Sequence, residues 1–372
     1  MLPIICLFGS KPVKHLIANE IAKFLILSKP MISLVTTVLN DRDGCGAFFQ
    51  QMEAQTMIPD EIVIVDGGSK DGTWEFLQNY QTTKYQLKVI QDIGCNVARG
   101  RNIAIAEATH KIIVSTDVGC IWESQWLAEL AQPLLDNEQI EAVMGSWQVR
   151  WQDLNSDWAK VEYALLGEPK LIATPHSHAS SRAIAYRKSL WSQIGGYPED
   201  LTLAGDDMVF ALLLHQATDK VACAPIPRCH WERHVSLKSF CKESRRNFFG
   251  GGEAGIWLKH SLLVGSRLAL EAGLLITACC TLLLAQSVAM SLIPLGLFLV
   301  SFVHRLVRLT PAIKYLEDFS YLDRWRRVIL FEYATKFWGL VGYWNGFRLG
   351  FQKCEQCRNR LKNKKFVLQI QT

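Results

Sequence analysis

Four polar side chains follow short, apolar, β-branched runs of the sequence at the points where those runs end. They are Thr37, Asn40, Asp66 and Asp117. If the runs are parallel strands, their carboxyl ends lie at one edge of a sheet, and such sheets bind their ligands there. The convergence of these four residues at one edge is therefore the first indication of a ligand site.

A second acidic feature comes later, where Asp206 and Asp207 follow Gly205 and open a predicted helix that includes 209–214. Adjacent carboxylates raise each other's pKa, which helps one of them accept a proton near neutral pH. The alternative is structural, because acidic residues at a helix N-terminus are favoured by the helix dipole.

The elements that must position these side chains alternate between strands and helices. We expect strands at 32–39, 61–65, 87–91 and 111–115, with helices at 48–55, around 74–76, at 98–108 and at 126–135. Ser69 or Asp71 is expected to cap the second of these helices. Alternation of this kind predicts an α/β domain with a mainly parallel sheet.

The composition is that of a globular protein, with 372 residues of which 49% are hydrophobic and 20% are charged. The formal net charge of +5 has a local origin in segment 353–372, where six basic residues stand against Glu355. Those basic residues are Lys353, Arg358, Arg360, Lys362, Lys364 and Lys365. The rest of the chain is near neutral, so we expect no nucleic-acid partner. A basic tail beside apolar helices is expected to meet anionic lipid headgroups.

One long apolar segment predicts membrane insertion, because no Asp, Glu, Lys or Arg occurs from Ala272 to Val303. The segment is too long for one span of about 20 residues and too short for two. A hairpin of two spans at 262–306 is favoured, since it returns the basic residues that follow to the side of the α/β domain. The alternatives are one span or a re-entrant pair. The later stretch 328–349 suits the membrane interface.

A series of short motifs occurs in an order that resembles the family 2 inverting glycosyltransferases. The resemblance covers residues 31–258, and the order of the motifs is more specific than any one of them. The motifs are Thr37-x-x-Asn40, Val65-Asp66-Gly67-Gly68-Ser69-Lys70-Asp71-Gly72-Thr73, Ala98-Arg99-Gly100-Arg101-Asn102, Thr116-Asp117-Val118-Gly119, Ser180-Ser181-Arg182, Gly195-Gly196-Tyr197-Pro198-Glu199, Gly205-Asp206-Asp207, Cys229-His230-Trp231-Glu232-Arg233 and Ser244-Arg245-Arg246.

This resemblance implies a domain of the GT-A type, with a mixed Rossmann-like sheet, which we expect at residues 30–258. An extension at 1–29 precedes it, and an amphipathic helix and basic tail at 311–372 follow the membrane hairpin. The implied reaction moves a sugar from a UDP- or GDP-sugar to an acceptor hydroxyl with inversion. We expect a glycan or lipid-linked acceptor at the cytoplasmic face of the plasma membrane, in envelope polysaccharide or glycolipid assembly.

The resemblance also implies a set of donor-binding residues, in which Asp66 would contact the nucleotide base. The set comprises Thr37, Asn40, Asp66, Asp71, Arg99, Asn102, Asp117, Arg245 and Arg246. Structural alternatives stand beside it. Asp66 and Asp71 would then form turns or caps, Thr37 would be an ordinary strand residue, and the two later arginines would form a solvated basic surface.

Asp117 resembles the first carboxylate of the family's Asp-x-Asp metal motif, and the implied cofactor is Mg²⁺ or Mn²⁺. Gly119 replaces the second carboxylate. Ligation would therefore rest on Asp117, the donor diphosphate and another group such as His230. Gly67 likewise replaces the second aspartate of the family's common Asp-Asp-x-Ser motif.

The pair Asp206-Asp207 resembles the family's Glu-Asp pair, in which the second carboxylate is the base. Direct displacement at an anomeric carbon requires a group that takes the proton of the attacking hydroxyl. We therefore predict Asp207 as the base and Asp206 as a positioning or acceptor-binding group. Trp231 would stack on the acceptor sugar, although a core tryptophan is equally expected.

Other classes of protein fit less well. A nicotinamide-dependent enzyme would need a Gly-x-Gly-x-x-Gly turn after the first strand, and a nucleotidyltransferase a basic, Gly-rich phosphate loop; the sequence has neither. A catalytically silent nucleotide-sugar-binding scaffold would explain Gly67 and Gly119 as signs of decay. The retained Asp66, Asp117 and Asp207 favour an enzyme.

Overall fold

The computed structural model describes residues 32–167, 170–178, 180–284 and 288–362. The predicted extension at 1–29 and the end of the basic tail lie outside the described residues. The strands are β1 (Ile32–Val38), β2 (Glu61–Asp66), β3 (Gln86–Gln91), β4 (Ile112–Ser115), β5 (Cys120–Trp122), β6 (Ala142–Gln148), β7 (Lys170–Leu171), β8 (Ile184–Arg187) and β9 (Val221–Trp231). The helices of the sheet domain are α2 (Arg42–Glu53), α3 (Thr73–Asn79), α4 (Val97–Glu107), α5 (Trp126–Asp136), α6 (Asp157–Leu166), α7 (Lys188–Ile194) and α8 (Asp206–Ala217).

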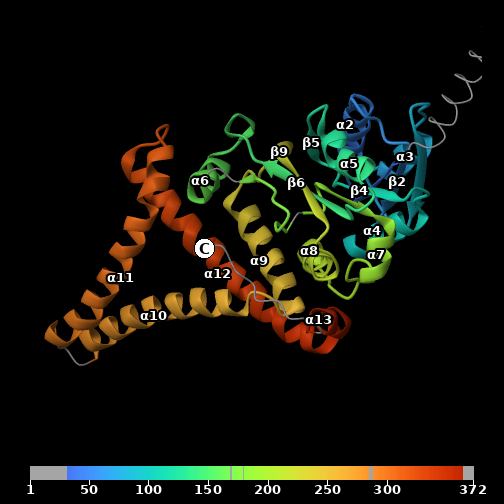
Figure 1. Ribbon diagram of the computed structural model, residues 1–372. Coiled ribbons are helices and arrows are strands. Elements are labelled where there is room, and N and C mark those ends of the chain that lie inside the picture. Colours follow the sequence, from blue (N-terminus) through green and yellow to red (C-terminus); the bar gives the residue numbers. More distant parts are fainter. Residues whose placement is uncertain (1–31, 168–169, 179, 285–287, 363–372) are drawn as a thin grey trace, which may run out of the picture.

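One mixed sheet of nine strands organises the domain, in the order β3-β2-β1-β4-β8-β6-β9-β5, with β7 beside β6 (Figure 1). The four strands expected from the sequence are confirmed, and β3, β2, β1 and β4 pair in parallel. The other half is different, because β8 runs antiparallel to both β4 and β6, and β5 runs antiparallel to β9. Within the second half only β6 and β9 pair in parallel, so the sheet is mixed there and parallel throughout in the first half.

Both faces of the sheet are covered by helices, which explains why its first strands are apolar throughout. In β1, Leu34 faces a cluster that includes Phe48 of α2, while the next residue, Val35, faces a cluster that includes Phe210 of α8. Successive strand residues point to opposite faces, so each strand contributes to both layers of core. This two-sided burial fixes the positions of the strand ends that carry the polar side chains.

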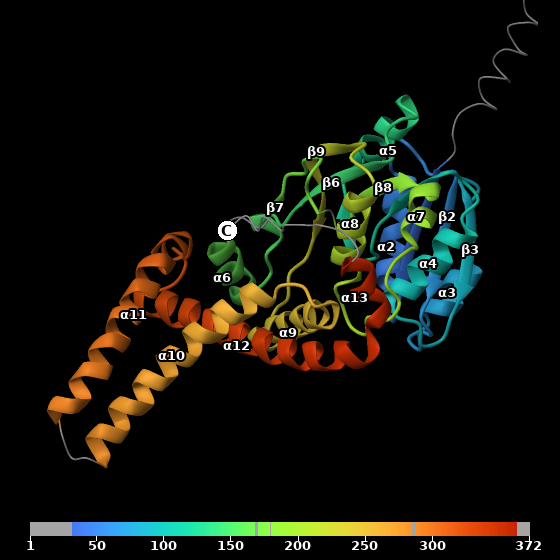
Figure 2. The same cartoon turned by 60° about the horizontal axis from the view of Figure 1, so that its bottom comes forward.

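Five helices follow or flank the sheet domain: α9 (Leu237–Ala254), α10 (Leu258–Leu283), α11 (Val288–Tyr315), α12 (Tyr321–Lys353) and α13 (Glu355–Lys362). Helix α10 and helix α11 are long and apolar enough to cross a membrane. They lie side by side and project away from the sheet domain, with mostly exposed side chains (Figures 1 and 2).

Helix α12 packs along α9 through a contact that we call the glycine seam, formed by Gly252 of α9 with Gly342, Gly346 and Gly350 of α12. A Cβ atom on Gly342 would collide with the carbonyl oxygen of Arg245, and one on Gly346 with that of Phe249. The two backbones therefore touch directly. Large aromatic side chains on α12, such as Trp338 and Trp344, are exposed.

The basic C-terminal segment is partly folded against the sheet domain. Arg358 of α13 donates hydrogen bonds to the carbonyls of Gly252 and Glu253 at 2.8 and 2.7 Å, and Arg360 donates to that of Ile194 at 2.8 Å. The expectation that the tail meets lipid headgroups is therefore wrong for these two arginines. Their charges instead satisfy carbonyl groups at the ends of α9 and α7.

Candidate active site

A pocket of about 380 Å³ lies at the carboxyl ends of β1, β2 and β4, and we call it the sheet-edge pocket. It is lined by Thr37, Val38, Leu39, Asp41, Val65, Gly67, Cys95, Asn96, Val97, Arg101, Asp117, Val118 and Arg246. Three residues of the predicted donor-binding set, Thr37, Asp117 and Arg246, are therefore brought together at this edge. Asp41 and Arg101 were not singled out from the sequence.

Asp66 is fully buried at the end of β2, directly before Gly67, which lines the sheet-edge pocket. Its Oδ1 accepts hydrogen bonds from the amides of Gly68 and Ser69 and from Gln91, at 2.9, 3.0 and 2.9 Å. Burial works to raise the pKa of Asp66, but these donors outweigh it and lower the pKa. Oδ2 is buried without a hydrogen-bond partner. One carboxylate oxygen thus holds the loop, while the other remains an unused acceptor.

Asn40 and Asp71 instead tie two loops together. The Asn40 side chain accepts a hydrogen bond from the amide of Lys70 at 2.8 Å. Asp71 accepts from the amide of Thr73 at 3.1 Å and from that of Arg42 at 3.3 Å. Both side chains lie outside the lining of the sheet-edge pocket. The N-cap of α3 is Gly72, so Asp71 supports the start of that helix from one residue earlier than a cap.

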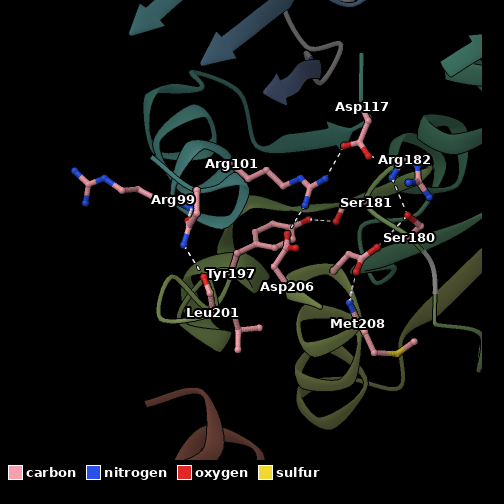
Figure 3. Close-up of polar contacts among 12 residues, drawn as sticks. Arg99, Arg101, Asp117, Ser180, Ser181, Arg182, Tyr197, Leu201, Asp206 and Met208 are labelled. Atoms are coloured by element: carbon pink, nitrogen blue, oxygen red, sulfur yellow. Dashed lines mark hydrogen bonds and ion pairs between the residues drawn. The ribbon is translucent and has the colours of Figure 1, made fainter. Parts of the chain in front are cut away.

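Arg99 and Asn102 of the motif at 98–102 make their contacts outside the pocket. Arg99 bonds to Asp92 at 2.6 Å, and Figure 3 shows it on the far side of α4 from Arg101. The Asn102 side chain donates to the carbonyl of Tyr197 at 3.0 Å and accepts from its amide at 2.8 Å. The structure therefore does not bring Arg99 and Asn102 to the pocket with Asp117.

Arg101 joins the two acidic regions that the sequence analysis treated separately. Its guanidinium bonds to Asp117 at 2.5 Å and also forms an ion pair with Asp206 (Figure 3). Only 5% of the Arg101 side chain is exposed. Because a buried guanidinium must be paired, both carboxylates are held in place by one side chain of α4.

A second pocket of about 430 Å³ adjoins the first, and we call it the carboxylate pocket. Arg101, Asp117 and Arg246 line both pockets, and Asp206, Asp207, Arg182 and Trp231 line the second. Asp207 accepts a hydrogen bond from the hydroxyl of Ser180 at 3.2 Å. The Arg182 guanidinium lies 4.7 Å from the centre of the Trp231 ring and 3.4 Å from Asp117.

The neighbouring charges shift the pKa values of two of these carboxyls in opposite directions. Burial raises the pKa of Asp206, and the charges of Asp207 and Asp117 add to this against the opposing effect of Arg101. Burial also acts to raise the pKa of Asp117, but Arg101 and Arg182 outweigh it and lower that pKa. Asp117 is therefore ionised at neutral pH.

Two residues predicted for the site, the metal ligand His230 and the donor-binding Arg245, lie outside both pockets. His230 is buried on β9, where its Nε2 contacts Glu123 at 2.9 Å. Since adjacent strand residues face opposite sides, His230 points away from the side on which Trp231 lines the carboxylate pocket. Arg245 stacks over the Trp338 ring of α12 at 5.7 Å, whereas the next residue, Arg246, faces both pockets.

The sequence contains a signal for one of the residues that was missed. Buried positions of α4 include Ala98, Arg101, Ala104 and Ile105, which have the spacing of one helix face. An arginine on an otherwise apolar helix face indicates a paired, buried charge. Asp41 and Arg182 carry no comparable local signal, because their roles depend on which loops the fold brings together.

Comparisons with known proteins agree with this architecture. Residues 33–195 match the family model described as glycosyl transferase family 2. The O-antigen chain rhamnosyltransferase WbaN of Salmonella anatum is 27% identical over 231 residues, covering 56% of this chain and 72% of that protein. Glycosyltransferase AglE of Haloferax volcanii is 20% identical over 259 residues, covering 66% of this chain and 81% of that protein.

Among solved structures, the mannosyltransferase PcManGT of Pyrobaculum calidifontis is similar with a TM-score of 0.50 and 20% identity, covering 82% of this chain and 95% of that one. The mixed sheet and the polar pockets at its edge define a glycosyltransferase of the GT-A fold. More particularly, residues 33–195 match glycosyl transferase family 2, and the similar curated proteins are named glycosyltransferases.

Proposed function

We propose that the protein transfers a sugar from a nucleoside diphosphate donor to an acceptor hydroxyl with inversion at the anomeric carbon. The observation that carries this proposal is that Asp117 and Asp207 line one pocket, which continues into the sheet-edge pocket. The similar mannosyltransferase structure contains GDP-Man and Mn²⁺, which supports a nucleotide-sugar donor here.

In this proposal the nucleotide occupies the sheet-edge pocket. Asp66 lies directly behind the pocket lining, between Val65 and Gly67, and its unpaired Oδ2 would accept a hydrogen bond from a base N–H that reached it. Thr37 lines the pocket itself. The diphosphate then lies toward Arg246, whose exposed guanidinium is free to pair with phosphate oxygens. This places the sugar in the carboxylate pocket.

The transfer step requires one base and one leaving group. The acceptor hydroxyl oxygen attacks the anomeric carbon while the bond from that carbon to the diphosphate oxygen breaks. Asp207 takes the hydroxyl proton, and the released charge on the diphosphate is balanced by Arg246 and Arg182. Trp231, held by Arg182, provides an apolar ring face for the acceptor sugar.

A divalent cation, Mg²⁺ or Mn²⁺, fits this arrangement through Asp117 and Asp41, which line the same pocket. A Cβ atom on Gly119 would lie 3.7 Å from Asp41 Oδ2, so Asp41 stands beside the position at which the family's second carboxylate is missing. When bound, the cation would offset charge on the diphosphate. The other ligands would be donor phosphate oxygens and water, since no group of three possible side-chain ligands occurs among the described residues.

Replacing Asp117 with Asn is expected to weaken binding of the nucleoside diphosphate about tenfold in the presence of Mn²⁺ and to leave metal-free binding little changed. Calorimetric titration with UDP and GDP, with and without Mn²⁺, measures both effects. Asp92→Asn, at a carboxylate of the same sheet edge outside both pockets, is the control. An Asp117→Asn protein with unchanged affinity in Mn²⁺ would contradict the assignment.

We further propose that the protein acts at the cytoplasmic face of a membrane, on a glycan or lipid-linked acceptor in envelope polysaccharide or glycolipid assembly. The long, exposed, apolar helices α10 and α11 support membrane attachment. The name of the Salmonella relative, an O-antigen chain rhamnosyltransferase, supports a role in envelope polysaccharide.

The remaining alternative is a silent scaffold that binds nucleotide sugars without turning them over. Incubating the purified protein with a panel of UDP- and GDP-sugars, with and without Mn²⁺, separates the two. We expect slow hydrolysis of one donor, because water can replace the acceptor in the carboxylate pocket. Binding of a donor with no hydrolysis and no transfer to any acceptor would favour the scaffold.

A further inference from the structure

A third pocket of about 650 Å³ lies where α10 and α11 meet the sheet domain, and we call it the helix-root pocket. Helices α6, α9 and α12 complete its walls. Five cationic side chains line it: Arg233, which precedes α9, Arg267 of α10, Arg305 and Arg308 of α11, and Lys336 of α12. The proposed sugar transfer assigns no role to any of them.

The charges of this pocket are not all neutralised from within. Arg233 pairs with Glu162 and Glu243, and Lys336 pairs with Glu332, so these acids of the lining are already engaged. Arg308 is exposed and forms no hydrogen bond or ion pair with any described residue.

Arg305, by contrast, is buried and paired with Glu271 and, at 3.7 Å, with Glu332. Only 4% of its side chain is exposed, and its guanidinium contacts both carboxylate oxygens of Glu271 at 2.8 and 2.9 Å. Its Nε is nevertheless buried without a partner. Arg267 reaches the same Glu271 only at 3.6 Å. The guanidinium of Arg308, the loosely paired Arg267 and the Nε of Arg305 are therefore the donors that remain for an anion in this pocket.

This pocket adjoins the carboxylate pocket. Arg233, Glu243 and Asn247 line both the helix-root pocket and the carboxylate pocket. Arg246, next to Asn247 on α9, also lines the sheet-edge pocket. The three pockets therefore form a series along α9, from the proposed nucleotide position past Asp207 to the base of the apolar helices.

Beyond the helix-root pocket, α10 and α11 carry no Asp, Glu, Lys or Arg within their described residues. Their outward side chains are exposed aliphatic groups, such as Ile276, Leu283, Ile293 and Val300. At 1.5 Å per residue, residues 288–303 of α11 extend about 24 Å past the pocket, and Figure 2 shows both helices projecting together from this point. The cationic pocket thus lies at the depth at which lipid phosphates would sit if the helices entered a bilayer.

We propose that the helix-root pocket binds the phosphate or diphosphate group of a lipid-linked acceptor. The hydrocarbon chain would then follow α10 and α11, and the attached saccharide would enter the carboxylate pocket and present its hydroxyl to Asp207. This inference rests on the proposed function for the presence of a saccharide acceptor. The pocket itself is assigned by its cations, by the lining residues that it shares with the carboxylate pocket and by its position at the base of the apolar helices.

The test uses the full chain in nanodiscs of neutral phospholipid, with a sugar-free polyprenyl diphosphate as the probe. Arg308→Gln and Arg267→Gln are expected to weaken probe binding, measured by native mass spectrometry, about tenfold each. Arg326→Gln is the matched control, because Arg326 is an exposed arginine of α12 outside the pocket. Hydrolysis of the donor should be unchanged in all three variants.

Several outcomes would overturn the inference. Equal binding by the wild type and both pocket variants would do so, as would an equal loss in Arg326→Gln. Binding of an uncharged polyprenol as tightly as the diphosphate would show that phosphate is not recognised. Displacement of the probe by an equal concentration of anionic phospholipid would assign the pocket to bulk lipid headgroups. If the wild-type protein did not hydrolyse any donor, that result would count against the proposed function and not against the pocket.

Discussion

Asp207→Asn is expected to reduce sugar transfer by about 10²–10⁴-fold while leaving donor affinity within a factor of about three. Asparagine keeps the size and the hydrogen bond to Ser180 but cannot accept the proton of the attacking hydroxyl. Donor affinity should persist because the proposed nucleotide contacts lie in the sheet-edge pocket, which Asp207 does not line. The measurements are the steady-state transfer rate and calorimetric titration with the donor.

The control for this change is Asp219→Asn, an exposed carboxylate just beyond the other end of α8. It should retain normal transfer. Transfer by Asp207→Asn within tenfold of the wild type would remove Asp207 as the base and leave Asp206 as the next candidate. Loss of donor binding together with transfer would mean that Asp207 holds the donor.

Arg101→Met is expected to give the largest loss of stability among the site residues. Methionine fills much of the same space but leaves Asp117 and Asp206 without their shared cation. Removing one partner of a buried ion pair costs about 3–5 kcal/mol. For a domain of this size the expected fall in melting temperature is on the order of 10 °C, which thermal unfolding monitored by intrinsic fluorescence can measure.

A matched control lies two residues away on the same helix. Arg99 also pairs with a carboxylate, Asp92, but its side chain is 54% exposed. Because exposed ion pairs contribute about 0–1 kcal/mol, Arg99→Met should shift the melting temperature by no more than about 3 °C. If the two variants melted together, the bridge between Asp117 and Asp206 would not be a structural element of the site.

The sequence predicts the first half of the sheet well because β1 to β4 are apolar runs buried on both faces. It predicts the second half poorly, since β5 and β8 are short and their pairing depends on distant segments. A similar division applies to the site. Asn40 and Asp71 follow strands, and this places them at the correct edge of the sheet. Their loop conformations, which the sequence does not reveal, make Asn40 bond to the loop of Asp71 and Asp71 to the loop of Asn40 instead of facing the pocket.

Arg101 illustrates the opposite case, a residue whose local pattern was informative although its partners were not predictable. The spacing of α4 predicts burial, but the carboxylates that compensate the charge come from segments 16 and 105 residues further along. His230 was expected near Asp117 on chemical type alone. Because successive residues of β9 face opposite sides of the sheet, its side chain lies on the side away from the carboxylate pocket.

The glycine seam has a mechanical consequence. Side chains between two helices can repack when one helix is pushed, and at the glycine seam no side chains separate the backbones of α9 and α12. A displacement of α12 would therefore also move the backbone of α9, which carries Arg246. If α12 lies at the membrane interface, as the sequence of 328–349 leads us to expect, a change in the lateral pressure of the lipid would shift Arg246, the residue proposed to pair with the diphosphate.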